Sequence, residues 1–433
     1  MDSDSDAPSL LDDIATPATE YGHGGMYQVV MLAVSLSILE IGFGFVAPVF
    51  PVYITELGMG GTELGALAAS FAVTRILLSG PLGGLSDRVG RKRMLVYSLL
   101  GFAIANVIYA LAQDAVVMVA ARSLEGAVSA GFFPAANAFV SDMTTPKNRG
   151  TAMGYLSTGS MVGFVVGPVV GGVLAEFLGI RLPFIVAALL SLFTMLLLSV
   201  LIREPKRKSM SGIVKGSSIP LKQVLSRAYT TYGALGVAMF ANMFAIGVLE
   251  VAFMLDAVTR FGIGPLEIGG FFGVIGVFMI IGNIGFGKLS DMKGRKWLIV
   301  TGALIGTLSM LLFANATNTI TFYFGAAVLS IGMSMRGPAI QAMIADMTDP
   351  KAYGNVMGLF GAISNSAYAV SPTMSGYLFD RDNNAISALL IAGGVSLVGG
   401  LVAAVALPGT AVAAYEQQTS KLPDAVTEEG KDD

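Results

Sequence analysis

Long apolar segments alternate with short polar breaks along almost the whole chain. A helix needs roughly 20 predominantly apolar residues to cross the hydrocarbon core of a bilayer, and many of these segments have that length. The pattern therefore predicts twelve membrane-spanning helices. They are expected at residues 27–53, 63–85, 93–112, 115–140, 150–176, 183–202, 228–258, 266–288, 296–314, 320–344, 352–378 and 385–407.

The second half of the chain repeats the first half at a constant offset of 204 residues. The segment at 83–95 reads GGLSDRVGRKRML, and the segment at 287–299 reads GKLSDMKGRKWLI. A repeat of this length determines architecture before any local assignment is made, and it predicts two six-helix bundles. The expected parts are a disordered cytosolic tail at 1–25, bundles at 26–202 and 228–408, a cytosolic linker at 203–227 and a second cytosolic tail at 409–433.

The composition supports an all-α membrane protein. Of the 433 residues, 54% are hydrophobic and only 13% are charged, whereas about a quarter are charged in a soluble domain. The chain has no Cys and one His, which excludes thiolate chemistry, histidine-rich zinc sites and histidine relays. No catalytic motif is present and the net charge is only −3, so we expect no enzyme activity, metal, cofactor or nucleic-acid partner.

The distribution of Lys and Arg predicts the orientation. Cytoplasmic loops of membrane proteins retain positive charge. Loops after the even-numbered helices hold 18 of the 26 basic residues, whereas the loops on the other side hold only Arg181, Arg260 and Arg381. We therefore expect a multi-pass protein of the cell membrane with both termini in the cytosol.

Five ionisable residues near the middle of predicted helices are candidates for function: Glu40, Arg122, Glu125, Glu250 and Arg336. Charges within a bilayer are costly, and they commonly mark ion pathways or pairs. Glu40 has no basic residue after it in its own helix, so it could carry a proton or pair with Arg75 of the next helix. Glu250 could likewise carry a proton, attract a cation or pair with Arg336. Arg122 and Glu125 are three residues apart, on one helix face and within reach of an ion pair.

The segment Gly84-Leu-Ser-Asp87-Arg88-Val-Gly90-Arg91 resembles the signature that the major facilitator superfamily carries between helices 2 and 3. Its second copy contributes Asp291, Gly294 and Arg295. Gly84 would allow close helix approach, and Gly90 would allow a tight reversal of the chain. The resemblance implies a conformational latch; a positively charged structural turn is the alternative.

Helix 5 carries a second family motif, GFVVGPVVGG. It resembles the string G-x-x-x-G-P-x-x-G-G of the twelve-helix drug:proton antiporters within this superfamily. The matching positions are Gly163, Gly167, Pro168, Gly171 and Gly172. Helix 4 carries RSLEG from Arg122, similar to the family pattern R-x-x-q-G, but an ion pair with Glu125 would neutralise the arginine.

The resemblance implies the major facilitator fold, in which two six-helix bundles alternate access to a site near the midplane. We expect proton-driven export of lipophilic or cationic small molecules by a monomer in the bilayer, with no cofactor besides the proton gradient. A symporter or facilitator for a sugar or another small metabolite is the alternative, although the helix 5 motif favours antiport. A receptor or scaffold would need a sizeable soluble domain, and no segment is long enough for one.

Overall fold

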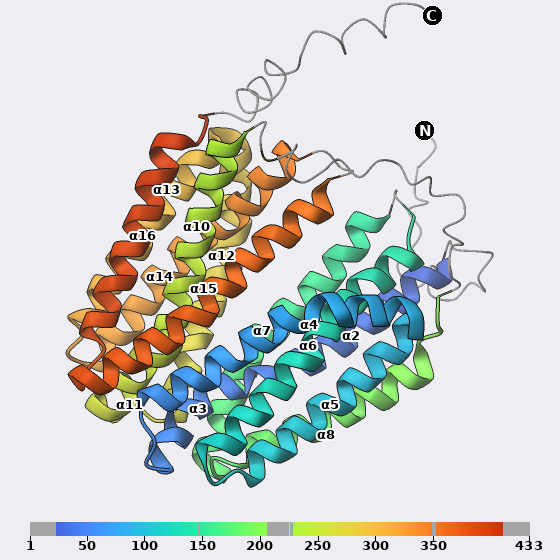
Figure 1. Cartoon of the computed structure of the whole chain (residues 1–433), viewed down its shortest axis with the longest axis horizontal. Coiled ribbons are helices and arrows are strands. Elements are labelled where there is room, and N and C mark those ends of the chain that lie inside the picture. The colour runs from blue at the N-terminus through green and yellow to red at the C-terminus, as the bar shows by residue number, and fades with distance from the viewer. Residues whose placement is uncertain (1–22, 146–147, 206–224, 226–227, 349–351, 410–433) are drawn as a thin grey trace, which may run out of the picture. The chain divides into compact units, whose positions relative to one another are not determined.

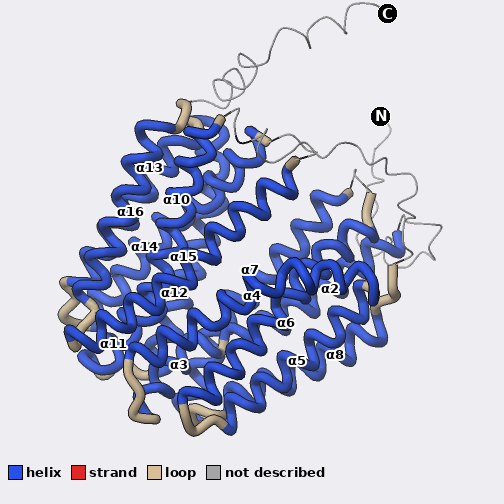
Figure 2. The backbone as a smooth tube through the Cα atoms, viewed as in Figure 1, coloured by secondary structure: helices blue, strands red, loops and turns tan. Residues whose placement is uncertain are grey.

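The computed structural model describes residues 23–145, 148–205, 225, 228–348 and 352–409. Most of the two predicted tails and most of the predicted linker lie outside these residues; residues 23–25, which were assigned to the first tail, belong to the first helix. Within the described ranges the chain forms helices joined by short loops and turns, without any strand (Figure 2). The expectation of an all-α protein is thereby confirmed.

The helices repeat along the chain with the predicted offset. The first half contains α2 (His23–Gly44), α3 (Val46–Glu56), α4 (Gly61–Val89), α5 (Arg91–Leu111), α6 (Ala115–Met143), α7 (Arg149–Leu178) and α8 (Leu182–Leu201). The second half contains α10 (Tyr229–Val248), the π-helix η1 (Leu249–Phe253), α11 (Met254–Phe261), α12 (Pro265–Lys293), α13 (Arg295–Ala314), α14 (Thr319–Met347), α15 (Tyr353–Asp382) and α16 (Ile386–Ala406). Adding 204 to the bounds of α4, α6 and α7 gives the bounds of α12, α14 and α15 at both ends.

Each of the twelve predicted spans coincides with a helix or an almost continuous helical run. Ten of these, among the described residues, are long and apolar enough to cross a membrane. The other two are α14 and α15, and in α14 small polar residues face the interior of the unit. Ser330 and Ser334 of α14 are buried and donate hydrogen bonds to backbone carbonyls one turn earlier. The reduced hydropathy of α14 therefore reflects the packing of polar groups inside the unit.

The chain reverses between paired helices at two equivalent glycines. Gly90 separates α4 from α5 with φ 109°, and Gly294 separates α12 from α13 with φ 88°. Positive φ is readily available to glycine alone, so each helix ends and the next begins after a single residue. The tight reversal predicted at Gly90 is present, and it recurs in the repeat.

By their contacts, the described residues form two compact units. The first comprises the described residues up to Phe50 and from Val73 to Pro205, and the second comprises Pro51–Ala72 and the described residues from Leu225 onward. The helix α4 therefore starts in the second unit and ends in the first. Residues 51–72, which the sequence assigned to the N-terminal bundle, group with the second unit.

Packing inside the units follows the repeat. In the first unit α2 packs on α7 and α8, and α5 packs on α6 and α8. In the second unit the equivalent helices pair in the same way: α10 on α15 and α16, and α13 on α14 and α16 (Figure 1). Each unit has its own core of buried apolar side chains. This shared framework gives equivalent positions in which to compare the candidate residues.

Candidate functional site: the buried charges of the two units

Glu40 lies on α2 within the first unit and has two polar neighbours. Its carboxylate is hydrogen-bonded to the side chain of Ser160 on α7, and it interacts electrostatically with Arg75 on α4. The Arg75 guanidinium also lies over the ring of Phe133, 5.5 Å from its centroid. Glu40 thus lies within electrostatic reach of Arg75, the partner named in the alternative interpretation. A carboxylate held by one hydroxyl and one cation retains partners in both protonation states.

The motif on α7 brings that helix against α2 at Glu40. A Cβ atom at Gly163 would lie 3.0 Å from Glu40 Cα, and one at Gly167 would lie 2.8 Å from Gly44 Cα. Pro168, Gly171 and Gly172 continue the same buried face. Small residues allow membrane helices to approach backbone to backbone, so this motif sets the position of the Glu40 backbone.

The ion pair predicted on α6 is present and fully enclosed. Arg122 Nη1 lies 2.7 Å from Glu125 Oε2, and the two side chains are 4% and 1% exposed. The Tyr109 hydroxyl on α5 donates a second hydrogen bond to the same carboxylate oxygen at 2.9 Å. The guanidinium also lies over the ring of Phe50. Charge on Arg122 is therefore compensated locally.

Glu250 lies on the π-helix η1, in the middle of the long helical run from Tyr229 to Phe261. Its carboxylate accepts a hydrogen bond from the Tyr368 hydroxyl of α15. The residue equivalent to Glu250 in the first half is Val46, and the run of α2 and α3 is interrupted by a turn at the residue before it, Phe45. π-turns within α-helices frequently occur at functional sites, and this one fixes the direction of the Glu250 side chain.

Arg336 on α14 forms no ion pair with Glu250. Its guanidinium donates to the amide oxygen of Asn242 on α10 and, at 3.0 Å, to the hydroxyl of Ser396 on α16. The side chain is 2% exposed, and its Nε is buried without a partner among the described residues. The arginine is thus held by neutral oxygen atoms on two neighbouring helices.

The arginine of the loop motif forms ion pairs in each half. Arg91 lies 2.5 Å from Asp87 and 3.4 Å from Asp142 on α6, and in the repeat Arg295 lies 2.8 Å from Asp346. The side chain of Asp291 lies outside the described part. No described atom lies within 4 Å of a Cβ at Gly84, so the close approach expected there is not made in this structure.

Comparison with known proteins agrees with this arrangement. The sequence model of the Major Facilitator Superfamily matches residues 32–294 and 235–428. The chain belongs to the major facilitator superfamily. The superfamily fold predicted from the loop motif, with twelve transmembrane helices in two pseudo-symmetric bundles, is thereby confirmed for this multi-pass transporter.

Several curated members of the superfamily are similar over most of their length. Multidrug resistance protein 2 of Bacillus subtilis (strain 168) is 28% identical over 379 residues, covering 86% of this chain and 92% of that protein. Quinolone resistance protein NorA of Staphylococcus aureus is 28% identical over 380 residues, covering 86% and 94%.

Solved structures of other transporters show the same fold. The nucleoside transporter NupG gives a TM-score of 0.72 at 14% identity, over 87% of this chain and 98% of that chain. A bacterial homolog of the human lysosomal transporter Spinster, in an inward-facing and occupied conformation, gives 0.70 at 18% identity, over 94% and 98%.

This superfamily member has one further polar contact that the sequence did not predict. Asp380, near the end of α15, accepts hydrogen bonds from the backbone N–H groups of Gly61 and Thr62 at 2.6 and 2.7 Å, and from the Thr62 hydroxyl. A carboxylate at a helix N-terminus is favourable because it satisfies free N–H groups and complements the helix dipole. Both partners lie in the second unit, so Asp380 fastens the start of α4 to α15.

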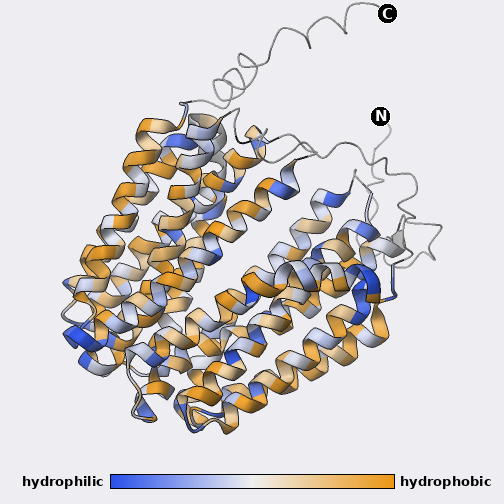
Figure 3. Cartoon of the chain, viewed as in Figure 1, coloured by the Kyte–Doolittle hydropathy of each residue, from blue (hydrophilic) through white to orange (hydrophobic). Residues whose placement is uncertain are grey.

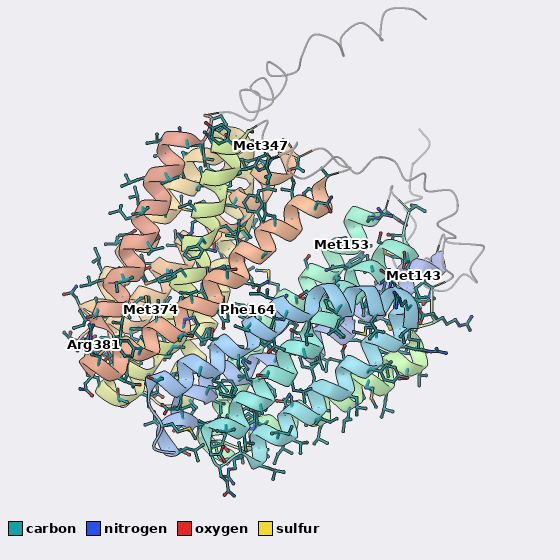
Figure 4. All side chains as sticks on the ribbon, viewed as in Figure 1. Met143, Met153, Phe164, Met347, Met374 and Arg381 are labelled. Carbon is teal, nitrogen blue, oxygen red and sulfur yellow. The ribbon has the colours of Figure 1, made fainter. Side chains whose placement is uncertain are left out.

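The glycines beside this contact allow the two backbones to meet. A Cβ at Gly65 would lie 2.5 Å from the Pro372 carbonyl oxygen, and one at Gly61 would lie 2.6 Å from that of Gly376. The neighbouring Arg381, labelled in Figure 4 at the end of α15, binds Asp382 at 2.7 and 2.9 Å. That hydrogen bonding lowers the pKa of Asp382 to about 2, so Asp382 remains ionised and paired with Arg381. The carboxylate that binds the start of α4 is that of Asp380.

Proposed function

We propose that this protein is a multidrug-type antiporter, which exports lipophilic or cationic small molecules from the cytosol in exchange for protons by alternating access. The observation that carries the proposal is the contact between the antiporter motif on α7 and Glu40 on α2. The names of the curated relatives, multidrug resistance protein and quinolone resistance protein, support the substrate class.

In this proposal Glu40 is the principal proton carrier. Its ionised form is favoured by Arg75 and Ser160, and its neutral form is favoured by the apolar surroundings of a membrane helix. A change in access to water on one side would shift the balance between these two forms. Glu250 is the second candidate, because its Tyr368 partner can donate to an ionised carboxylate or accept from a protonated one. The proton gradient then supplies the energy, and no cofactor is required.

The test is transport by purified protein in liposomes that contain a pH-sensitive dye. Addition of a lipophilic cation such as tetraphenylphosphonium to one side should move protons in the opposite direction. Glu40→Gln should abolish uphill accumulation, whereas Glu56→Gln, which removes an exposed carboxylate at the outer end of the same helical run, should leave it intact. Protons moving in the same direction as the substrate would support the alternative, a symporter. Uphill transport by Glu40→Gln together with its loss in Glu250→Gln would move the proton site to α10–α11.

The orientation is proposed from the charge bias, with the loops around Arg91 and Arg295 and both termini in the cytosol. The chain contains no cysteine, so single cysteines can be labelled without further engineering. Impermeant maleimide added to intact cells should leave Arg91→Cys unlabelled and should label Asn383→Cys, which lies between α15 and α16 on the opposite side. Labelling of the cysteine at 91 from outside would contradict the orientation.

A further inference from the structure

A cavity of about 680 Å³ lies where the end of α4, the start of α5 and the end of α8 meet. All the residues that line it belong to the first unit, on the face that the charge bias places in the cytosol. Its volume is within the range of about 300–1,000 Å³ that is usual for small-molecule sites. None of the membrane-buried charges described above lines it, so it is a separate feature.

The wall of this cavity is strongly basic. Four cationic side chains line it, and Glu204 is the one acidic residue among them: the basic residues are Arg88, Lys92, Arg93 and Arg203. The Glu204 carboxylate accepts hydrogen bonds from the backbone N–H groups of Arg91 and Lys92 at 2.6 and 3.1 Å. Its charge is therefore directed at the N-terminus of α5. Among the described residues, no carboxylate forms an ion pair with Arg88, Arg93 or Arg203.

The second half of the chain shows that the turn itself does not require these basic residues. At the positions 204 residues later, Arg88, Arg93, Arg203 and Glu204 are replaced by Met292, Trp297, Leu407 and Pro408. The equivalent turn at Gly294 still forms, and the ion pair of Arg295 with Asp346 is retained. Lys92 keeps a basic counterpart in Lys296. Three of the four cationic side chains are thus an addition to one half of a repeated structure, and they call for an explanation other than folding of the loop.

Along α5 and α8, away from the cavity, the surface consists of large apolar side chains. α5 and α8 pack together, and their ribbons are mostly orange in Figure 3. The exposed residues are Tyr97, Leu100, Ile104, Val107 and Leu111 on α5, and Leu189, Phe193, Leu196 and Val200 on α8. Tyr97 also lines the cavity and is 61% exposed. Tyrosines are enriched where a membrane helix meets the interface, so the cavity is at headgroup level.

We propose that this cavity binds the phosphate of an anionic phospholipid from the cytosolic leaflet, with the acyl chains lying along α5 and α8. Arginine donors recognise phosphate oxygens through bidentate, charge-assisted hydrogen bonds, and Arg88, Arg93 and Arg203 supply them. Basic pockets between membrane helices on the cytoplasmic side suit anionic headgroups. Arg88 and Gly90 of the loop motif line the cavity themselves, so an occupied site would contact that motif directly.

The test uses fluorescence quenching by brominated lipids. The only tryptophan is Trp297, and its Nε1 has no partner among the described residues, so Trp297→Phe removes no hydrogen bond described there. In that background Tyr97→Trp places a reporter at the cavity, and Thr301→Trp places one at the repeat-related position of the second unit. Each protein is reconstituted in phosphatidylcholine with increasing fractions of brominated phosphatidylglycerol, and in a parallel series with brominated phosphatidylcholine.

Phosphatidylglycerol should bind next to the reporter at 97 at least about fivefold more strongly than phosphatidylcholine, the factor expected for one Lys or Arg near an anionic surface. The reporter at 301 should show no such preference. Arg88→Gln with Arg93→Gln should remove the preference at 97, whereas the matched double change Arg149→Gln with Lys296→Gln, outside the cavity, should retain it. Circular dichroism and gel filtration check that each variant is folded.

Three results would overturn the proposal. The first is equal quenching by the two lipids at position 97, and the second is a preference that survives loss of Arg88 and Arg93. The third concerns the source of the phosphate. Inorganic phosphate, compared with sodium chloride at the same ionic strength, should leave the quenching by phosphatidylglycerol unchanged; displacement of the lipid would assign the cavity to a soluble phosphate compound instead.

Discussion

Each half of this transporter buries an arginine among membrane helices, but the two arginines have different partners. Arg122 in the first unit has a carboxylate 2.7 Å away. In the part of the chain that the structure describes, Arg336 in the second unit is bonded to the amide oxygen of Asn242 and the hydroxyl of Ser396, both neutral. Positions 204 residues from Arg122 and Glu125 hold Ala326 and Leu329, so the ion pair was not part of what the repeat preserved.

The difference shows that one framework tolerates two ways of burying a cation. In a low-dielectric interior, a paired charge retains most of its favourable interactions, whereas a cation bonded to neutral oxygens bears a larger desolvation cost. The first unit therefore has a locally neutral core around α6. The second unit retains a positive charge near α10. That helix continues directly into η1, the π-helix that carries Glu250. Three substitutions test this contrast.

The largest effect is expected from Glu125→Gln. Loss of the carboxylate leaves Arg122 buried without a counter-charge, and removing one partner of a buried pair typically costs about 3–5 kcal/mol. The free energy of unfolding in detergent, followed by circular dichroism against urea or temperature, should fall by about that amount. Adding Arg122→Gln should recover part of the loss, because the double variant has no unpaired charge. Equal stability of the single variant and the parent would mean that the pair carries no such constraint.

A smaller and opposite effect is expected from Asn242→Asp, which would give Arg336 a carboxylate of the same size. The present bond already has one charged partner, the guanidinium; an ionised acceptor would add Coulombic attraction, which is partly offset by the cost of desolvating the new carboxylate. The free energy of unfolding should therefore rise by about 1 kcal/mol. The same substitution in an Arg336→Met background serves as the control, and there it should lower stability, because the new carboxylate would be buried alone.

The smallest change in stability is expected from Arg336→Met. Replacing a buried charged group by a well-packed apolar one of similar length is often neutral or stabilising, and the loss of two hydrogen bonds opposes that gain. The net change in the free energy of unfolding should stay within about 1 kcal/mol, whereas Arg122→Met should destabilise as strongly as Glu125→Gln. Similar losses in the two methionine variants would show that both arginines are compensated alike.

Much of the fold could be predicted from the sequence. The repeat at a constant offset and the lengths of the apolar segments are both signals that extend over whole helices. The turn at Gly90 and the pairing of Arg122 with Glu125 were also predictable. Each depends on residues close together in the chain, where spacing alone determines geometry.

The partners on other helices were not predictable. Asn242, Ser396, Tyr368 and Tyr109 each contribute one polar atom to a site from a different helix. Helices that are apolar on all sides carry no periodic signal for the face that meets a given neighbour. The π-helix at Glu250 was missed for a related reason: it changes the hydrogen-bond pattern without altering the composition. The turn at Phe45 lies at the position equivalent to Leu249, the first residue of the π-helix. It indicates an irregular position in the repeat only when the two halves are compared.

The contact between α4 and α15 has a mechanical consequence. Side chains that interlock must change rotamers before two helices can separate, and this raises the barrier to movement. Gly61, Gly65 and Gly376 contribute no side chain to such interlocking, and the hydrogen bonds named there all converge on the single carboxylate of Asp380. Replacing that carboxylate weakens these hydrogen bonds and leaves the backbone packing in place. Asp380→Asn should therefore alter the speed of the transport cycle more than the stability of the fold.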